Sequence, residues 1–129
     1  SQVRAYIDSD VLIWHLRGER RATTLLRSLR DSNEYELWIG AMQRAEIVFF
    51  MRPDEEEATR IFLSEFKTAS VTQEIVDAAG ELYRRWAPSH GIDANDAILA
   101  ATAKATGGQI FCLNRKHYPM PEVIAKKAW

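Results

Sequence analysis

Three acidic residues, far apart in the sequence, have the residue type and local setting of a hydrolytic metal site. Asp8 directly follows an apolar run, Glu46 interrupts a second apolar stretch, and Asp96 lies at the start of an alanine-rich segment. Clustered carboxylates repel one another, and a divalent cation with hard oxygen ligands relieves that repulsion. If the chain brings the three together, they indicate a magnesium or manganese ion that activates water and neutralises charge on a phosphoryl oxygen.

Each acid also has a purely structural interpretation. Asp8 could serve only as the N-cap of the helix that follows it, and Asp93 could cap the helix that contains Asp96. Glu46 could face a polar edge or pair with Arg44, although an ionised glutamate is seldom fully buried without a partner. The sequence leaves these alternatives open, because a metal site requires a fold in which the acids converge.

Alternating strands and helices would produce that convergence. Apolar composition predicts short buried strands at residues 3–7, 36–39 and 109–113, the last being the final clear strand, and a further short strand at residues 70–72. Helical spacing and capping residues predict helices at residues 8–16, 22–29, 43–51, 54–66, 75–86 and 97–105, the 43–51 helix being mostly buried. This pattern predicts an α/β fold with a parallel sheet and helices on both faces, whose sites gather at the carboxyl ends of strands.

Length and composition favour one domain over residues 1–129. The chain is 47% hydrophobic and 27% charged, which suits an ordinary globular domain with a sizeable core. No apolar run approaches the ~18 residues that span a bilayer, and the N-terminus has no signal-peptide pattern, so we expect a soluble cytoplasmic protein. Cys112 is the only cysteine, which excludes an intramolecular disulfide.

The net charge of −1 is a cancellation between segments. Residues 1–30 carry a net charge of +3, residues 31–82 carry −8, and residues 83–129 carry +4. Near-neutrality alone would argue against a nucleic-acid partner, but the two basic ends remove that objection.

Four blocks of sequence hold the three acids and the end of the last predicted strand: residues 6–18, 39–47, 92–103 and 112–120. In this order and spacing they resemble the PIN-domain nucleases, and within them the VapC-type toxins of bacterial toxin–antitoxin pairs. The third block, with Asp96 ahead of an alanine-rich helix, is the most specific. The resemblance covers essentially the whole chain and implies a PIN-like three-layer α/β/α fold with a short central sheet.

The resemblance implies a metal-dependent endoribonuclease that hydrolyses RNA phosphodiester bonds with Mg²⁺ or Mn²⁺. The implied catalytic and metal-binding residues are Asp8, Glu46 and Asp96. Residues implied to support them are Ser9, Asp93 and Asn114. Because Asn114 stands where many relatives have a fourth aspartate, and an amide brings no charge, we expect chemistry with a single ion.

The resemblance also implies partners: an RNA substrate, a small inhibitory antitoxin and a second copy of the chain in a homodimer. Basic residues that follow the first and last blocks are candidates to bind RNA at the mouth of the site: Arg17, Arg20, Arg21, Arg115 and Lys116. Each could equally belong to an ordinary solvated surface. Exposed apolar positions on the early helices are candidate interface residues: Trp14, Leu25 and Leu26.

Two other functions are compatible with the same fold. A non-catalytic module could hold RNA or a protein partner near Asn114, but the presence of all three acids argues against it. A PIN-type RNA-processing nuclease is the second alternative, which the short length disfavours. No motif in the sequence identifies the RNA target.

Overall fold

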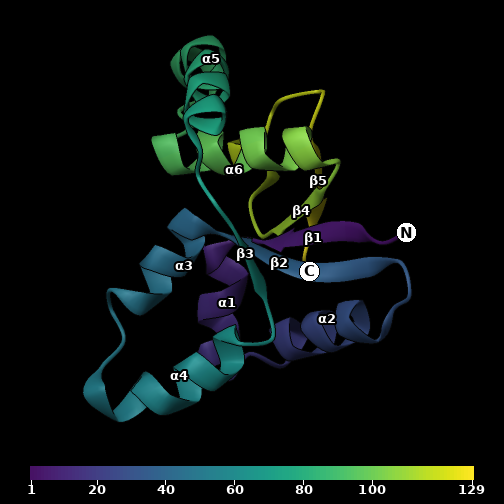
Figure 1. The fold of residues 1–129 in the computed structure, drawn as a ribbon, viewed down its shortest axis with the longest axis vertical. Helices are drawn as coiled ribbons and strands as arrows, with labels where there is room; N and C mark the ends of the chain where they lie inside the picture. Colours follow the sequence, from purple (N-terminus) through teal and green to yellow (C-terminus); the bar gives the residue numbers. More distant parts are fainter.

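A computed structural model describes residues 1–129, and its centre is a parallel sheet of five strands (Figure 1). The strand order is β3-β2-β1-β4-β5, with β1 in the middle. The strands are β1 (Val3–Ile7), β2 (Tyr35–Gly40), β3 (Lys67–Ala69), β4 (Gln109–Cys112) and β5 (Ile124–Lys127). Because every pairing is parallel, the carboxyl ends of all five strands lie at one edge of the sheet.

Helices cover both faces of the sheet, which confirms the predicted α/β architecture. Figure 1 shows α5 and α6 above the sheet and α1 to α4 below it. The helices are α1 (Ser9–Leu16), α2 (Arg20–Asp31), α3 (Ala41–Val48), α4 (Glu56–Leu63), α5 (Gln73–His90) and α6 (Ala94–Thr106). Two short 3₁₀ helices, η1 (Pro53–Glu55) and η2 (Arg115–His117), complete the chain. No helix is long and apolar enough to cross a membrane.

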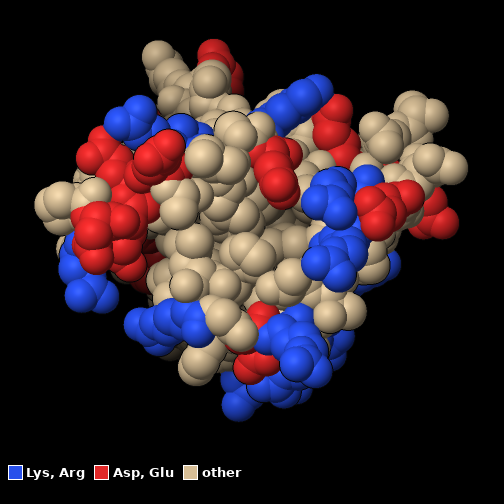
Figure 2. Space-filling model, turned by 90° about the horizontal axis from the view of Figure 1, so that it is seen from below, with Lys and Arg blue, Asp and Glu red and all other residues tan.

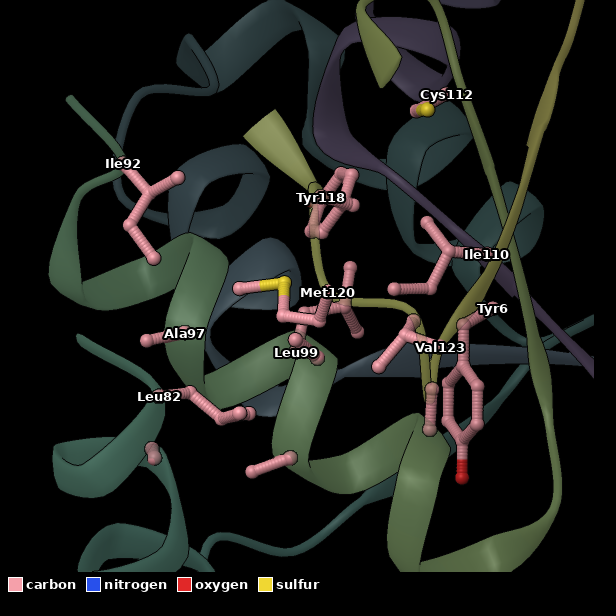
Figure 3. Packing of buried hydrophobic residues seen from close by; sticks show 14 of the residues in the cluster. Tyr6, Leu82, Ile92, Ala97, Leu99, Ile110, Cys112, Tyr118, Met120 and Val123 are labelled. Carbon is pink, nitrogen blue, oxygen red and sulfur yellow. The ribbon is translucent and has the colours of Figure 1, made fainter. Parts of the chain in front are cut away.

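Successive side chains of β1 point to opposite faces of the sheet, and the core accordingly has one layer on each face. Tyr6 packs with the α5 and α6 side, whereas Ala5 and Ile7 pack with α1, α2 and α4. Figure 3 shows the first layer, in which Tyr6, Ile110 and Leu99 are fully buried. The alanine-rich surface of α6 lets this helix lie close to the sheet.

The close approach of the backbone at position 108 to the Tyr6 ring requires glycine there. A Cβ atom at this position would lie 2.4 Å from the Tyr6 ring, far inside van der Waals contact. Gly107, the residue before it, ends α6 in the left-handed conformation with a φ of 67°. The two glycines therefore let the chain turn sharply from α6 into β4.

Several predicted boundaries are wrong. The strand expected at residues 70–72 lies instead at Lys67–Ala69, where Lys67 and Thr68 are exposed on an edge strand and give no apolar alternation. The edge strand β5 was not predicted, because its four residues include two lysines and only one is even half-buried. The predicted 43–51 helix ends at Val48, and the two phenylalanines that follow are exposed rather than buried.

Candidate active site

The three predicted acids come from elements that meet at the carboxyl edge of the sheet. Asp8 follows the last residue of the central strand β1, and Glu46 lies on α3, which follows β2 directly. Asp96 lies in the first turn of α6, a helix that contacts both α3 and β1. The fold therefore brings together residues that are 38 and 50 positions apart in the sequence.

Asp8 is buried, with 8% of its surface exposed, and both of its oxygens accept hydrogen bonds. The backbone N–H of Ser9 donates to Oδ1 at 2.8 Å, and the Tyr118 hydroxyl donates to Oδ2 at 2.7 Å. Burial raises the pKa of Asp8, the two hydrogen bonds lower it, and the negative charges of Asp10 and Glu46 raise it further. Asp8 does cap α1, as the structural interpretation predicted, and it also faces the other acids.

Glu46 is partly buried and is held at both carboxylate oxygens. The Ser9 hydroxyl donates to Oε2 at 2.5 Å, and the side-chain amide of Asn95 donates to Oε1 at 3.2 Å. Arg44 does not pair with Glu46; it donates to the Thr68 hydroxyl instead, at 3.3 Å. Ser9 therefore contacts one of the three acids directly.

Asp96 and Asp93 form a reciprocal cap at the start of α6. The Asp96 N–H donates to Asp93 Oδ1 at 2.8 Å, and the Asp93 N–H donates to Asp96 Oδ2 at 3.1 Å. Burial raises the pKa of Asp96 to about 6; the negative charges of Asp93 and Asp8 also raise it, while the Asp93 N–H and His117 lower it. His117 Nδ1 lies 3.9 Å from Asp96 Oδ1.

Asn114 lies two residues beyond β4 and is exposed. Its side-chain oxygen accepts a hydrogen bond from the Lys116 N–H at 3.1 Å, and its amide nitrogen lies 3.4 Å from His117 Nε2. It forms no hydrogen bond with the three acids. In the structure Asn114 therefore caps η2 and contacts the site only through the histidine beside Asp96.

The donor chemistry of the cluster fits a hard divalent cation. Repulsion from Glu46 contributes to the raised pKa of Asp8, and repulsion from Asp8 contributes to the raised pKa of Asp96. None of the three carboxylates is paired with a lysine or arginine. As the side chains stand, no group of three acidic, histidine or cysteine residues is close enough to ligate one ion. The three acids are candidate oxygen donors, and their side chains would have to move closer together to ligate one ion.

A groove of about 630 Å³ lies beside Glu46, on the α1, α3 and α4 side of the molecule. Glu46 is one of its lining residues, together with apolar side chains from Ile13, Leu16, Ile47 and Phe50. Figure 2, a view from below, shows acidic side chains gathered at the left and basic ones mainly at the bottom and right. Half of the residues that line the groove are polar or charged, so the groove offers a partner both apolar and charged contacts beside Glu46.

The predicted RNA-binding residues occupy different settings. Arg17 lines the groove beside Glu46, and its guanidinium lies 5.6 Å from the Trp14 ring. Arg21 pairs with Glu19 at 2.9 Å and lies over the Trp129 ring, so its side chain is already engaged. The other three candidates are exposed: Arg20, Arg115 and Lys116.

Of the three predicted interface residues, two are accessible to a partner and one is buried. Trp14 is 42% exposed and Leu25 is half-buried, so both remain candidates. Leu26 is wrong as an interface residue, because it is 7% exposed and packs in the core between α2 and the sheet. The most exposed apolar side chains are instead Phe49 and Phe50, at 77% and 79%.

Sequence reasoning missed two residues that hold the acids. Tyr118 donates to Asp8 across 110 positions of sequence, and Asn95 donates to Glu46 across 49. Asn95 carried a local signal, since it is a polar residue beside Asp96 on the first turn of a helix. Tyr118 carried none, because a tyrosine followed by Pro119 and Met120 resembles an ordinary core residue.

Comparison with known proteins identifies the family. The PIN domain family model matches residues 5–122. The chain therefore belongs to the PIN-domain family. Its relatives there include Ribonuclease VapC19 of Mycobacterium tuberculosis, 36% identical over 88% of this chain and 91% of that protein, and Ribonuclease VapC10 of the same organism, 38% identical over 92% and 88%.

Solved structures agree on the fold. A toxin–antitoxin complex from Klebsiella pneumoniae contains a chain with a TM-score of 0.80 at 23% identity, covering 97% of this chain and 98% of that one. A DNA-bound VapBC from Salmonella typhimurium gives 0.81 at 12% identity, covering 99% and 100%. At these identities the likeness supports the three-layer architecture alone.

Proposed function

We propose that this protein is a divalent-metal-dependent endoribonuclease and the toxin of a toxin–antitoxin pair. The observation that supports the proposal is the position of Asp8, Glu46 and Asp96 at the carboxyl edge of the sheet, where none of them pairs with a lysine or arginine. The ribonuclease names of its VapC relatives support RNA as the substrate. We also propose that residues 1–129 form one domain, since both core layers pack on the same sheet, and that it acts in the cytoplasm, where RNA is available.

The acids Asp8, Glu46 and Asp96 would hold the ion, Mg²⁺ or Mn²⁺. Such an ion, when bound, activates water for attack on a phosphodiester and neutralises charge on the phosphoryl oxygens. A single ion is the expected number, because Asn114 brings no negative charge to the site.

The chain's own residues keep the donors in place and handle the proton. Ser9 and Asn95 fix the two oxygens of Glu46, and the Asp93 N–H fixes Asp96 Oδ2. Asp96 Oδ1 accepts no hydrogen bond within the chain, so it can take the proton that an attacking water releases.

RNA cleavage by matched variants tests this proposal. Purified wild-type protein with Mg²⁺ or Mn²⁺ is expected to cleave total RNA, and mapping the cut ends would define the target. Asp8→Asn and Asp96→Asn are expected to be inactive, whereas Asp77→Asn, a change at an exposed aspartate of α5, should retain activity. Full cleavage by either active-site variant would refute the assignment and favour a different site or a contaminating nuclease.

We propose that the groove beside Glu46 receives an apolar segment of a small antitoxin. Solved structures with this fold include toxin–antitoxin complexes by their titles, from Klebsiella pneumoniae and as VapBC from Salmonella typhimurium. Phe50 lines the groove and is 79% exposed, so a partner would remove a large apolar area from water. A segment seated there would also cover the approach to the acids, and so would inhibit cleavage.

Co-purification tests the antitoxin and light scattering tests the homodimer. Wild-type protein co-expressed with the small protein encoded beside it is expected to purify as a complex without ribonuclease activity. Phe50→Asp is expected to release the partner.

The free protein is expected to scatter as a dimer, with Trp14 and Leu25 as candidate interface residues, and a monomer at micromolar concentration would contradict the dimer.

A further inference from the structure

Tyr118 is a buried tyrosine whose hydroxyl points to the acidic cluster. It follows η2 in the loop between β4 and β5, and only 4% of its surface is exposed. Figure 3 shows its ring in the same packed cluster as Met120 and Ile92. The ring is thus fixed by the core, and its hydroxyl is the polar end of an otherwise apolar residue.

The hydroxyl makes one hydrogen bond, to Asp8 Oδ2 at 2.7 Å. The other oxygen of Asp8 accepts the Ser9 N–H at 2.8 Å, so two donors from distant segments define the carboxylate's orientation. Each oxygen keeps a second lone pair, so these bonds do not prevent Asp8 from binding a cation.

Asp8 needs this support more than the other acids do. It is the only buried one of the three, since Glu46 and Asp96 are half-buried, and a buried carboxylate oxygen needs a hydrogen-bond donor. Glu46 has its own pair of side-chain donors in Ser9 and Asn95. Without the Tyr118 hydroxyl, Asp8 Oδ2 would have no donor in the chain, and the orientation of the carboxylate would be less well defined.

We propose that Tyr118 is a positioning residue that holds the Asp8 carboxylate in the orientation needed to bind the divalent cation. This inference rests on the proposed function, because it assigns a role toward the metal. It makes the loop after β4 part of the site, together with the segments that carry the three acids. Hydroxyl donors behind metal-binding carboxylates commonly change metal affinity by about 10-fold to 100-fold when removed.

Mn²⁺ binding to the protein without RNA tests the inference. Tyr118→Phe keeps the ring and removes only the hydroxyl, and it is expected to weaken Mn²⁺ affinity by about 10-fold in calorimetric titration. The matched control is Tyr6→Phe, which removes a buried hydroxyl from the same core cluster but at a place bonded to Thr106 and Arg4. This control is expected to bind Mn²⁺ as the wild type does, and thermal melts establish that both variants are folded.

The outcomes separate the two proposals. If wild type does not bind Mn²⁺, the proposed function fails. If wild type binds and Tyr118→Phe binds equally well, or if Tyr6→Phe weakens binding as much, the positioning role is refuted while the proposed function stands. Two further results are expected: most of the turnover of Tyr118→Phe returns at saturating Mn²⁺, and the wild-type Tyr118 hydroxyl proton exchanges slowly by NMR. A rapidly exchanging proton would contradict the bond to Asp8.

Discussion

Replacing Asp96 with asparagine should make the metal-free protein more stable while abolishing its activity. The folded protein raises the pKa of Asp96 from an ordinary 3.8 to about 6, chiefly because the carboxylate is taken out of water. A carboxyl group with a raised folded pKa binds its proton more tightly in the folded state than in the unfolded one. Its contribution to stability is therefore present below pH 3.8 and is lost as pH rises toward 6.

The magnitude follows from the size of that pKa change. Taken in full, a change from 3.8 to about 6 corresponds to about 3 kcal/mol of lost stability at neutral pH. The group is partly open to solvent, and screening reduces this to about 1–2 kcal/mol. Asparagine has the same shape, and its side-chain oxygen can still accept the Asp93 N–H. For a chain of this size the gain corresponds to roughly 3–10 °C in melting temperature.

Thermal and urea unfolding in chelator, from pH 3.5 to 8, measures this effect. The stability difference between Asp96→Asn and wild type should be near zero at pH 3.5, increase through pH 4–6, and remain constant above. The control Asp77→Asn, at an exposed site, should show no such gain. Mg²⁺ should stabilise wild type and leave Asp96→Asn unchanged. A variant less stable than wild type at pH 7, or a difference independent of pH, would refute the electrostatic reasoning.

Three other perturbations follow from particular contacts. Ser9→Ala removes the 2.5 Å bond to Glu46 and should lower the cleavage rate about 10-fold with little change in melting temperature; unchanged kinetics would contradict its role. Gly108→Ala places a methyl group against the Tyr6 ring and should destabilise the fold by about 1–3 kcal/mol in urea unfolding, whereas a stable variant would contradict the packing. Phe50→Ala, at a 79% exposed side chain, should change stability by less than about 0.5 kcal/mol yet weaken antitoxin binding in pull-down assays, and undiminished binding would place the partner elsewhere.

Local patterns in the sequence predicted the parts of the fold that carry strong local signals. The last three residues of the strand Val3–Ile7 are apolar and buried, and Asp8 caps the helix that follows. The strand and the helix therefore appear as predicted. The reciprocal cap of Asp93 and Asp96 marked the start of α6 in the same way. Such signals lie within a few residues of one another, and they do not depend on the rest of the chain.

The edges of the sheet and the support of the site could not be predicted in this way. The strand Ile124–Lys127 is stabilised by pairing with β4, and its exposed lysines give no apolar pattern. The bond from Tyr118 to Asp8 depends on a core that forms only when segments 110 residues apart meet. The pairing of Asn95 with Glu46 likewise needs α3 and α6 side by side. These features belong to the tertiary structure, which a pattern along one chain does not specify.

The central claim is that the carboxylates at the edge of the sheet hold a cation for RNA hydrolysis, and a chelation and restoration assay tests it most directly. Purified wild-type protein is incubated with a single-stranded RNA in Mg²⁺ or Mn²⁺, then in excess EDTA, and then with the metal added back, beside Asp8→Asn throughout. We predict cleavage with metal, none in EDTA, recovery on restoration, and no cleavage by the variant at any stage. Cleavage that continues in excess EDTA, or that Asp8→Asn performs as well as wild type, would contradict the claim.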